Sequence, residues 1–125
     1  MNELKITGDK STPEVFLNPA GLIIIKGRSI HENMRDFFKP VEKWVDDYIN
    51  NDPAEITSID ISLEYFNSTT AKVLISLLQK LLKVQLKSKK LIINWYYEEG
   101  DDDIQEKGEY FSSVLKMPFN FKQLK

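Results

Sequence analysis

Alternation of hydrophobic and polar residues is clearest over residues 58–66, where Ile59, Ile61 and Leu63 recur at every second position with polar residues between them. Successive side chains of a strand point to opposite faces of a sheet. This segment is therefore predicted to be a strand with one face on a core and the other in solvent.

Further β-rich runs lie on either side of this strand. Residues 14–17 and 21–26 are separated by Asn18-Pro19-Ala20, which is typical of a hairpin turn. Residues 90–97 predict another strand, and residues 119–121 predict a last strand at the sheet edge.

Helical spacing appears in three places. Before the first helix, Ser29 and Glu32 have the spacing of a capping box, and Pro40 inside that helix predicts a kink or a short break. Apolar residues three and four apart continue the helix as far as position 49. Residues 71–86 carry a wide apolar face, and the acidic stretch from 101 predicts a third helix running to about residue 114.

The predicted order is β-β-α-β-α-β-α with a possible final strand. Alternation of strands and helices indicates parallel strand pairs joined by right-handed crossovers. We expect one α/β domain over residues 1–125, with about three helices packed on a mixed sheet of four or five strands.

The composition limits the kinds of chemistry that the protein could carry out. The chain has no Cys and one His, so it has no disulfide, no thiolate nucleophile and no His-pair metal site. We expect no catalytic residues, no metal and no cofactor.

The distribution of charge along the chain limits the kinds of partner that the protein could bind. Lysines crowd residues 80–90, acids crowd residues 98–109, and the net charge is −2 with only two arginines. This is a dipolar surface and not a basic nucleic-acid footprint. The lysines are expected on an exposed helix face and the turn after it. No apolar run approaches the roughly 20 residues that span a bilayer, and the N-terminus lacks a secretory h-region, so a cytoplasmic protein is expected.

The turn Asn67-Ser68-Thr69-Thr70 lies where the clearest strand leads into a helix. Ser, Thr and Asn are good helix caps, so the turn can be purely structural. A phosphate on a hydroxyl here would instead meet the free amides and the positive end of the helix dipole. A nucleophilic Ser68 would need a base, and the sequence places none beside it.

Two other clusters have alternative interpretations. The acidic segment 98–109 could bind a cation or form part of a small-molecule enzyme, but it does not match a calcium loop and suits a solvated helix start. Among the adjacent aromatic residues, Trp95 is expected in the core. Tyr96 and Tyr97 are expected either in the core or in contact with a partner.

Several segments, in order along nearly the whole chain, resemble the SiaC family of bacterial regulatory phosphoproteins. They are Ser11-Thr12-Pro13, Gly27-Arg28-Ser29-Ile30-His31-Glu32-Asn33, Leu63-Glu64-Tyr65-Phe66-Asn67-Ser68, Trp95-Tyr96-Tyr97-Glu98 and Met117-Pro118-Phe119. That family is similar in fold to STAS domains, the class of the anti-sigma-factor antagonists, so the resemblance implies a STAS-like domain.

The resemblance implies a partner-switching protein without enzymatic activity. A cognate kinase would phosphorylate the hydroxyl residue after the turn asparagine, and a PP2C-type phosphatase would reverse this. The unphosphorylated form would bind and activate an effector such as a diguanylate cyclase, which links the family to cyclic-di-GMP and biofilm signalling. The acceptor position, usually Thr in the family, is Ser68 here, with Thr69 and Thr70 as neighbouring hydroxyls.

This interpretation gives specific expectations. Unmodified Ser68 caps the helix and is accessible to solvent, while Leu63 and Leu78 are buried. The partner-binding residues are expected to be Tyr65, Asn67, Ser68, Thr69 and Lys72. The same fold and turn also suit an anti-sigma-factor antagonist that binds a kinase-type anti-sigma factor.

Overall fold

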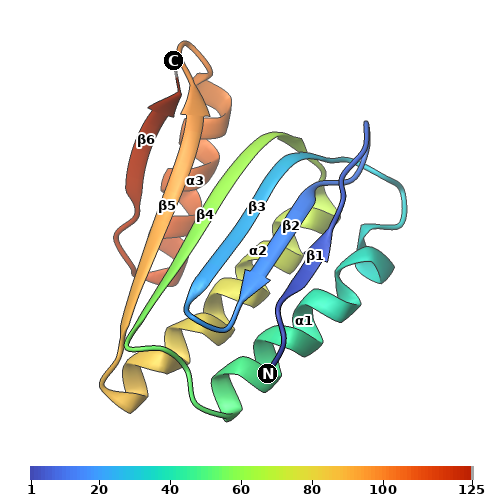
Figure 1. The fold of residues 1–125 in the computed structure, drawn as a ribbon. Helices are drawn as coiled ribbons and strands as arrows, with labels where there is room; N and C mark the ends of the chain where they lie inside the picture. Colours follow the sequence, from blue (N-terminus) through green and yellow to red (C-terminus); the bar gives the residue numbers. More distant parts are fainter. Residues whose placement is uncertain (125) are drawn as a thin grey trace.

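Three helices cover one face of a six-stranded sheet and leave the other face open in the computed structural model, which describes residues 1–124 (Figure 1). The elements are β1 (Leu4–Ile6), β2 (Glu14–Asn18), β3 (Leu22–Ser29), α1 (Met34–Asn50), β4 (Ile56–Phe66), α2 (Ser68–Leu81), the 3-10 helix η1 (Leu82–Lys87), β5 (Lys90–Glu98), α3 (Asp102–Leu115) and β6 (Asn120–Leu124).

The strands lie in the sheet in the same order as in the chain. The first three are joined as antiparallel neighbours, with Val15 opposite Ile25 and Leu17 opposite Ile23. From β3 to β6 all pairs are parallel, and each connection is a crossover through one α-helix, followed by η1 in the connection from β4 to β5. The predicted mixed sheet with parallel crossovers is confirmed.

Alternation along β4 decides which face the helices cover. Ile59, Ile61 and Leu63 are buried beneath the helices, whereas Asp60 and Ser62 between them remain partly exposed on the open face. Leu78 of α2 is fully buried on the covered side. The predicted burial of Leu63 and Leu78 is therefore confirmed.

The sheet has six strands and not the four or five expected. The additional strand β1 is only three residues long, and it pairs with β2 through Leu4 opposite Leu17 and Ile6 opposite Val15. So short a segment is below the length at which alternation gives a usable signal. Its position is fixed by pairing and by the Trp44 Nε1–H group, which donates to the Asn2 carbonyl at 2.9 Å.

The predicted capping box at Ser29 and Glu32 is wrong. Ser29 is the last residue of β3 and is fully buried, and α1 is capped by Asn33, whose side chain accepts the Asp36 N–H group. Pro40 lies on the exposed side of α1, and the helix continues through it without the predicted break.

The predicted helix over 71–86 begins earlier and ends earlier, because α2 starts at Ser68 and gives way to η1 at Leu82.

Part of the lysine cluster is structural and not simply exposed. Lys80 pairs with Asp46 of α1 at 3.1 Å, and Lys89, largely buried, contacts the carbonyl of Pro53. Within residues 1–124, no helix has both the length and the hydrophobicity needed to cross a bilayer.

Candidate functional site

The strand-to-helix turn after β4 is held against the end of β3 by backbone hydrogen bonding. Asn67 follows the last residue of β4, and its N–H group donates to the Ser29 carbonyl at 3.0 Å. Ser68 is the first residue of α2. This link fixes the start of α2 at the carboxyl end of the parallel strands.

Asn67 caps α2, and this corrects the expectation that Ser68 does so. The Asn67 side-chain oxygen accepts the Thr70 N–H group at 2.9 Å, and its amide nitrogen donates to the His31 carbonyl at 3.0 Å. One side chain therefore satisfies a free amide of the helix and ties down the loop before α1. The cap leaves the Ser68 hydroxyl outside this network.

The three adjacent hydroxyls lie in different surroundings. Ser68 is exposed and Thr69 is half-buried, whereas Thr70 is fully buried. The Thr70 hydroxyl lies 2.7 Å from the Ser29 hydroxyl and donates to the Ser29 carbonyl at 3.0 Å. An enzyme that modifies a hydroxyl would reach Ser68 without moving the turn, but would have to unfold it to reach Thr70.

Exposed side chains surround the turn. Tyr65 is 55% exposed, and the Arg28 guanidinium lies 4.9 Å from the centre of its ring. Lys72 is exposed one helical turn after Ser68. Lys107 of α3 places its ammonium group 5.4 Å from the Phe66 ring. The candidate site is thus an exposed hydroxyl three residues after an exposed aromatic residue, with cations on the neighbouring elements.

The structure brings the loop of His31 to this turn, which the sequence did not predict. His31 is exposed, and its Nδ1 accepts the Asn33 N–H group at 3.1 Å while its carbonyl binds Asn67. The two segments are 36 residues apart, so only the β3–β4 pairing could have revealed their proximity. In the described part of the chain, no hydrogen bond joins the His31 ring to Ser68.

The acidic segment serves the start of α3. Asp101 is its N-cap and accepts the Ile104 N–H group at 3.1 Å, and Asp103 pairs with Lys107 at 2.6 Å. Among residues 1–124, no three acidic or His side chains gather in an arrangement that could hold a metal ion.

Among the three adjacent aromatic residues, Trp95 is in the core as predicted, with its Nε1–H group donating to the Ile104 carbonyl at 2.9 Å. Tyr96 and Tyr97 are both half-buried.

Together, the fold and the turn define a class of small α/β domain in which helices cover one face of a sheet and an exposed hydroxyl begins a helix at the carboxyl end of a parallel strand. A family model described as SiaC family regulatory phosphoprotein matches residues 6–124. The chain belongs to the SiaC family.

Individual relatives agree with this assignment. A functionally uncharacterised protein of Pseudomonas aeruginosa strain UCBPP-PA14 is 26% identical over 120 residues, which cover 95% of this chain and 94% of that protein. The crystal structure of apo-SiaC from Pseudomonas aeruginosa has a TM-score of 0.83 at 24% identity, with both chains covered completely.

A similar fold occurs in a solved complex. In the crystal structure of the diguanylate cyclase SiaD with its activator SiaC from Pseudomonas aeruginosa, the matching chain has a TM-score of 0.84 at 24% identity, and the match covers 97% of this chain and 99% of that one. These structural likenesses confirm the expected α/β fold.

Proposed function

We propose that this protein is a partner-switching regulator without enzymatic activity, controlled by reversible phosphorylation of Ser68. A cognate kinase adds the phosphate and a PP2C-type phosphatase removes it. The unphosphorylated form binds and activates an effector, for which a diguanylate cyclase is the best candidate. The exchange takes place in the cytoplasm, where the kinase has ATP.

The observation that carries this proposal is the difference in exposure between the neighbouring hydroxyls of Ser68 and Thr70. The chain belongs to a family of regulatory phosphoproteins, so an exposed hydroxyl at this turn is a candidate acceptor. Ser68 is exposed, whereas Thr70 is buried and hydrogen-bonded. A kinase and a phosphatase must both reach the same oxygen, which favours Ser68. Support for a cyclase as effector comes from the SiaD–SiaC complex, whose SiaC chain has the same fold.

A phosphate on Ser68 would change the start of α2 electrostatically. It carries a charge of about −2 and would lie at the positive end of the helix dipole. Lys72 is four residues further along the helix, the spacing at which an anion and a cation pair on a helix surface. The phosphate is therefore accommodated by the fold, and its main effect falls on what docks there.

The docking surface in this proposal comprises Tyr65, Ser68, Thr69 and Lys72. Tyr65 supplies an exposed aromatic surface of the kind that anchors interfaces. Asn67 supports it indirectly, because its side chain is already bound to Thr70 and the His31 loop. A phosphate would impose a dianion on this surface and draw Lys72 away from a partner.

Phosphorylation by the cognate kinase and ATP, read by mass spectrometry, tests the acceptor. We expect one phosphate on Ser68 in the wild type and none in Ser68→Ala. Ser113→Ala, which removes another exposed hydroxyl at the far end of α3, is the matched control and should be phosphorylated normally. Phosphate found on another residue would refute the site.

A pull-down or titration with the effector tests the switch. Ser68→Asp should weaken binding strongly, and a loss of about 3 kcal/mol corresponds to roughly 150-fold in affinity. Ser68→Ala should bind like the wild type. Equal binding by Ser68→Asp and the wild type would refute the switch while leaving the acceptor assignment intact.

A further inference from the structure

The sheet divides at the carboxyl ends of its parallel strands. Pairing of β3 with β4 continues to Ser29 opposite Phe66, and pairing of β5 with β6 continues to Glu98 opposite Leu124. Pairing between β4 and β5 ends earlier, at Ile61 opposite Trp95. Figure 1 shows β5 and β6 leaning away from β4 at this end. We call this opening the β4–β5 fork, bounded by residues 62–66 and 96–98.

Aromatic side chains close the fork from the helix side. Phe66 lies 6.0 Å from both Trp95 and Phe111, measured between ring centres, and Trp95 lies 5.3 Å from Phe111. Across the fork, no backbone hydrogen bond joins the two strands in the described part of the chain. The facing backbone edges are therefore available to another molecule from the open side.

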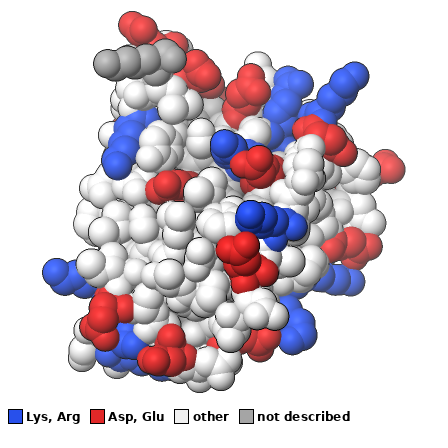
Figure 2. Space-filling model, viewed as in Figure 1, with Lys and Arg blue, Asp and Glu red and all other residues white. Residues whose placement is uncertain are grey.

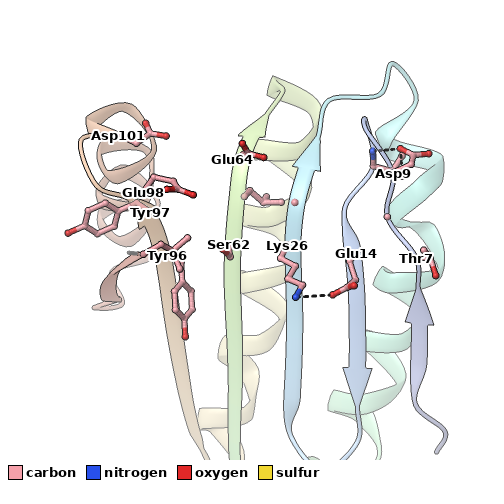
Figure 3. A pocket seen from close by; sticks show the side chains of 15 residues that line it. Thr7, Asp9, Glu14, Lys26, Ser62, Glu64, Tyr96, Tyr97, Glu98 and Asp101 are labelled. Atoms are coloured by element: carbon pink, nitrogen blue, oxygen red, sulfur yellow. Dashed lines mark hydrogen bonds and ion pairs between the residues drawn. The ribbon is translucent and has the colours of Figure 1, made fainter.

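A cavity of about 430 Å³ extends on the open face of the sheet from the loop between β1 and β2 to the fork. Its lining includes Ser62 and Glu64 from β4 and Tyr96 and Glu98 from β5. Figure 3 shows Glu98 extending from β5 toward β4, with Glu64 at the upper end of β4. In open α/β sheets, ligands bind outside the carboxyl ends of the strands, which is where this cavity lies.

The charge of the cavity is unbalanced. Its lining contains five carboxylates and one amine, and that amine, on Lys26, is 3.4 Å from Glu14 (Figure 3). Asp9 accepts the Ser11 and Thr12 N–H groups, and Asp101 caps α3. Two carboxylates, Glu64 and Glu98, form no ion pair with any of residues 1–124.

Part of the open face beside the cavity lacks charge. Figure 2 shows a mostly white area on the left of this face, whereas blue and red side chains lie down its centre and toward the right and the upper end. Lys122 of β6 places its ammonium group 5.8 Å from the Tyr96 ring and so covers that aromatic surface. The charged groups that the fork itself offers are the carboxylates of Glu64 and Glu98, beside backbone edges that carry both N–H and C=O groups.

We propose that the β4–β5 fork binds an arginine side chain of a protein partner. A guanidinium has five N–H donors and no acceptor, which matches a cavity rich in acceptors and in negative charge. Its long aliphatic stem can cross the uncharged part of the open face and bring the head group to Glu64 and Glu98. Because the cavity carries an excess of negative charge, its occupant is a basic segment of a protein.

This site is separate from the proposed phosphorylation site. The fork opens on the uncovered face of the sheet, whereas Ser68 begins a helix on the covered face. The fork needs no phosphate on Ser68, so Ser68→Ala should leave arginine binding unchanged. The two proposals can therefore fail independently.

The experiment is an amide chemical-shift titration of the full chain with the peptide acetyl-Gly-Gly-Arg-Gly-Gly-amide. A matched peptide with citrulline in place of arginine keeps the shape of the side chain and removes its charge. We expect saturable shifts in residues 62–66 and 96–98 with arginine and none with citrulline. Binding should weaken as salt is raised, because the carboxylates of the cavity are partly exposed.

Variants locate the interaction. The double variant Glu64→Gln/Glu98→Gln should weaken arginine binding about tenfold, the effect of losing two partly exposed charge pairs. Glu109→Gln, an equivalent change on the exposed face of α3, should leave it unchanged. Equal binding of the citrulline peptide, shifts outside the fork, or no saturation would overturn the proposal. Free L-arginine binding as tightly as the peptide would overturn the assignment to a protein partner.

Discussion

The Thr70 hydroxyl lies 2.7 Å from the Ser29 hydroxyl, 41 residues away, and both side chains are fully buried. Thr70 also donates to the Ser29 carbonyl, which accepts the Asn67 N–H group as well. The end of β3 and the start of α2 are thus joined by a buried polar contact two residues along the chain from the exposed Ser68. A buried, satisfied polar contact of this kind makes the base of the turn rigid.

This contact predicts opposite costs for two neighbouring substitutions. Thr70→Val keeps the volume but leaves the buried Ser29 hydroxyl without its partner, and should lower the free energy of unfolding by about 1–3 kcal/mol. Ser68→Ala removes an exposed hydroxyl and should change it by less than about 0.5 kcal/mol. Urea denaturation measures both, and a larger loss in Ser68→Ala would contradict the assigned burial.

The asparagine cap gives a graded prediction. Asn67→Ala removes the acceptor for the Thr70 N–H group and the donor to the His31 carbonyl, and should destabilise the protein by about 1–2 kcal/mol. Asn67→Asp keeps the acceptor and loses only the donor. The stability of Asn67→Asp should therefore fall between that of the wild type and that of Asn67→Ala in thermal or urea unfolding. An aspartate variant as unstable as the alanine variant would mean that the cap contributes little.

Gly108 predicts a packing effect against Trp95. A Cβ atom added at Gly108 would lie 2.6 Å from two atoms of the Trp95 ring, which is held in the core by its hydrogen bond to the Ile104 carbonyl. Gly108→Ala should destabilise by about 1–3 kcal/mol despite the higher helix propensity of alanine. Tryptophan fluorescence and urea unfolding report the change.

Ser113→Ala, at an exposed position of the same helix, controls for helix propensity without steric overlap. If Gly108→Ala were as stable as that control, α3 would have to sit further from β5 than the structure places it.

Asp9 predicts an acid-dependent loss of stability. Hydrogen bonds from the Ser11 and Thr12 backbone N–H groups hold the pKa of Asp9 below its usual value. Because the pKa of Asp9 is lower in the folded state than in the unfolded state, Asp9 stabilises the fold at pH values above its unfolded pKa of about 3.9. This stabilisation disappears as the pH falls through the folded-state pKa. Asp9→Asn keeps an acceptor but cannot titrate, so the stability gap between variant and wild type should narrow from pH 7 to pH 3. A constant gap would contradict the prediction.

Strong periodic patterns in the sequence predicted most of the elements. Residues 58–66 gave β4 to within two residues of its start, and the acidic helix start at Asp101 predicted α3 to within one residue at either end. Such signals are local, because alternation and first-turn acids depend only on neighbours in the chain. The three-residue β1 was missed, since its position depends on pairing with β2.

The candidate site was predicted in part. The sequence singled out Asn67 to Thr70 as a turn of capping residues, and the resemblance to the SiaC family selected Ser68 among them. It could not distinguish the roles of these residues, because Asn, Ser and Thr all cap helices well. The error at Ser29 has the same origin: a sound local capping signal was overridden when β3 extended to Ser29 and buried its hydroxyl against Thr70.

The sequence by itself determined the order of the elements, the covered and open faces of the sheet, and the position of the turn, because periodicity and composition are local properties. Only the tertiary structure decided that Asn67 is the cap, that Thr70 is buried while Ser68 is exposed, and that β4 and β5 part beyond Ile61 and Trp95. Each of these depends on contacts between segments far apart in the chain. No pattern of neighbouring residues encodes such a contact.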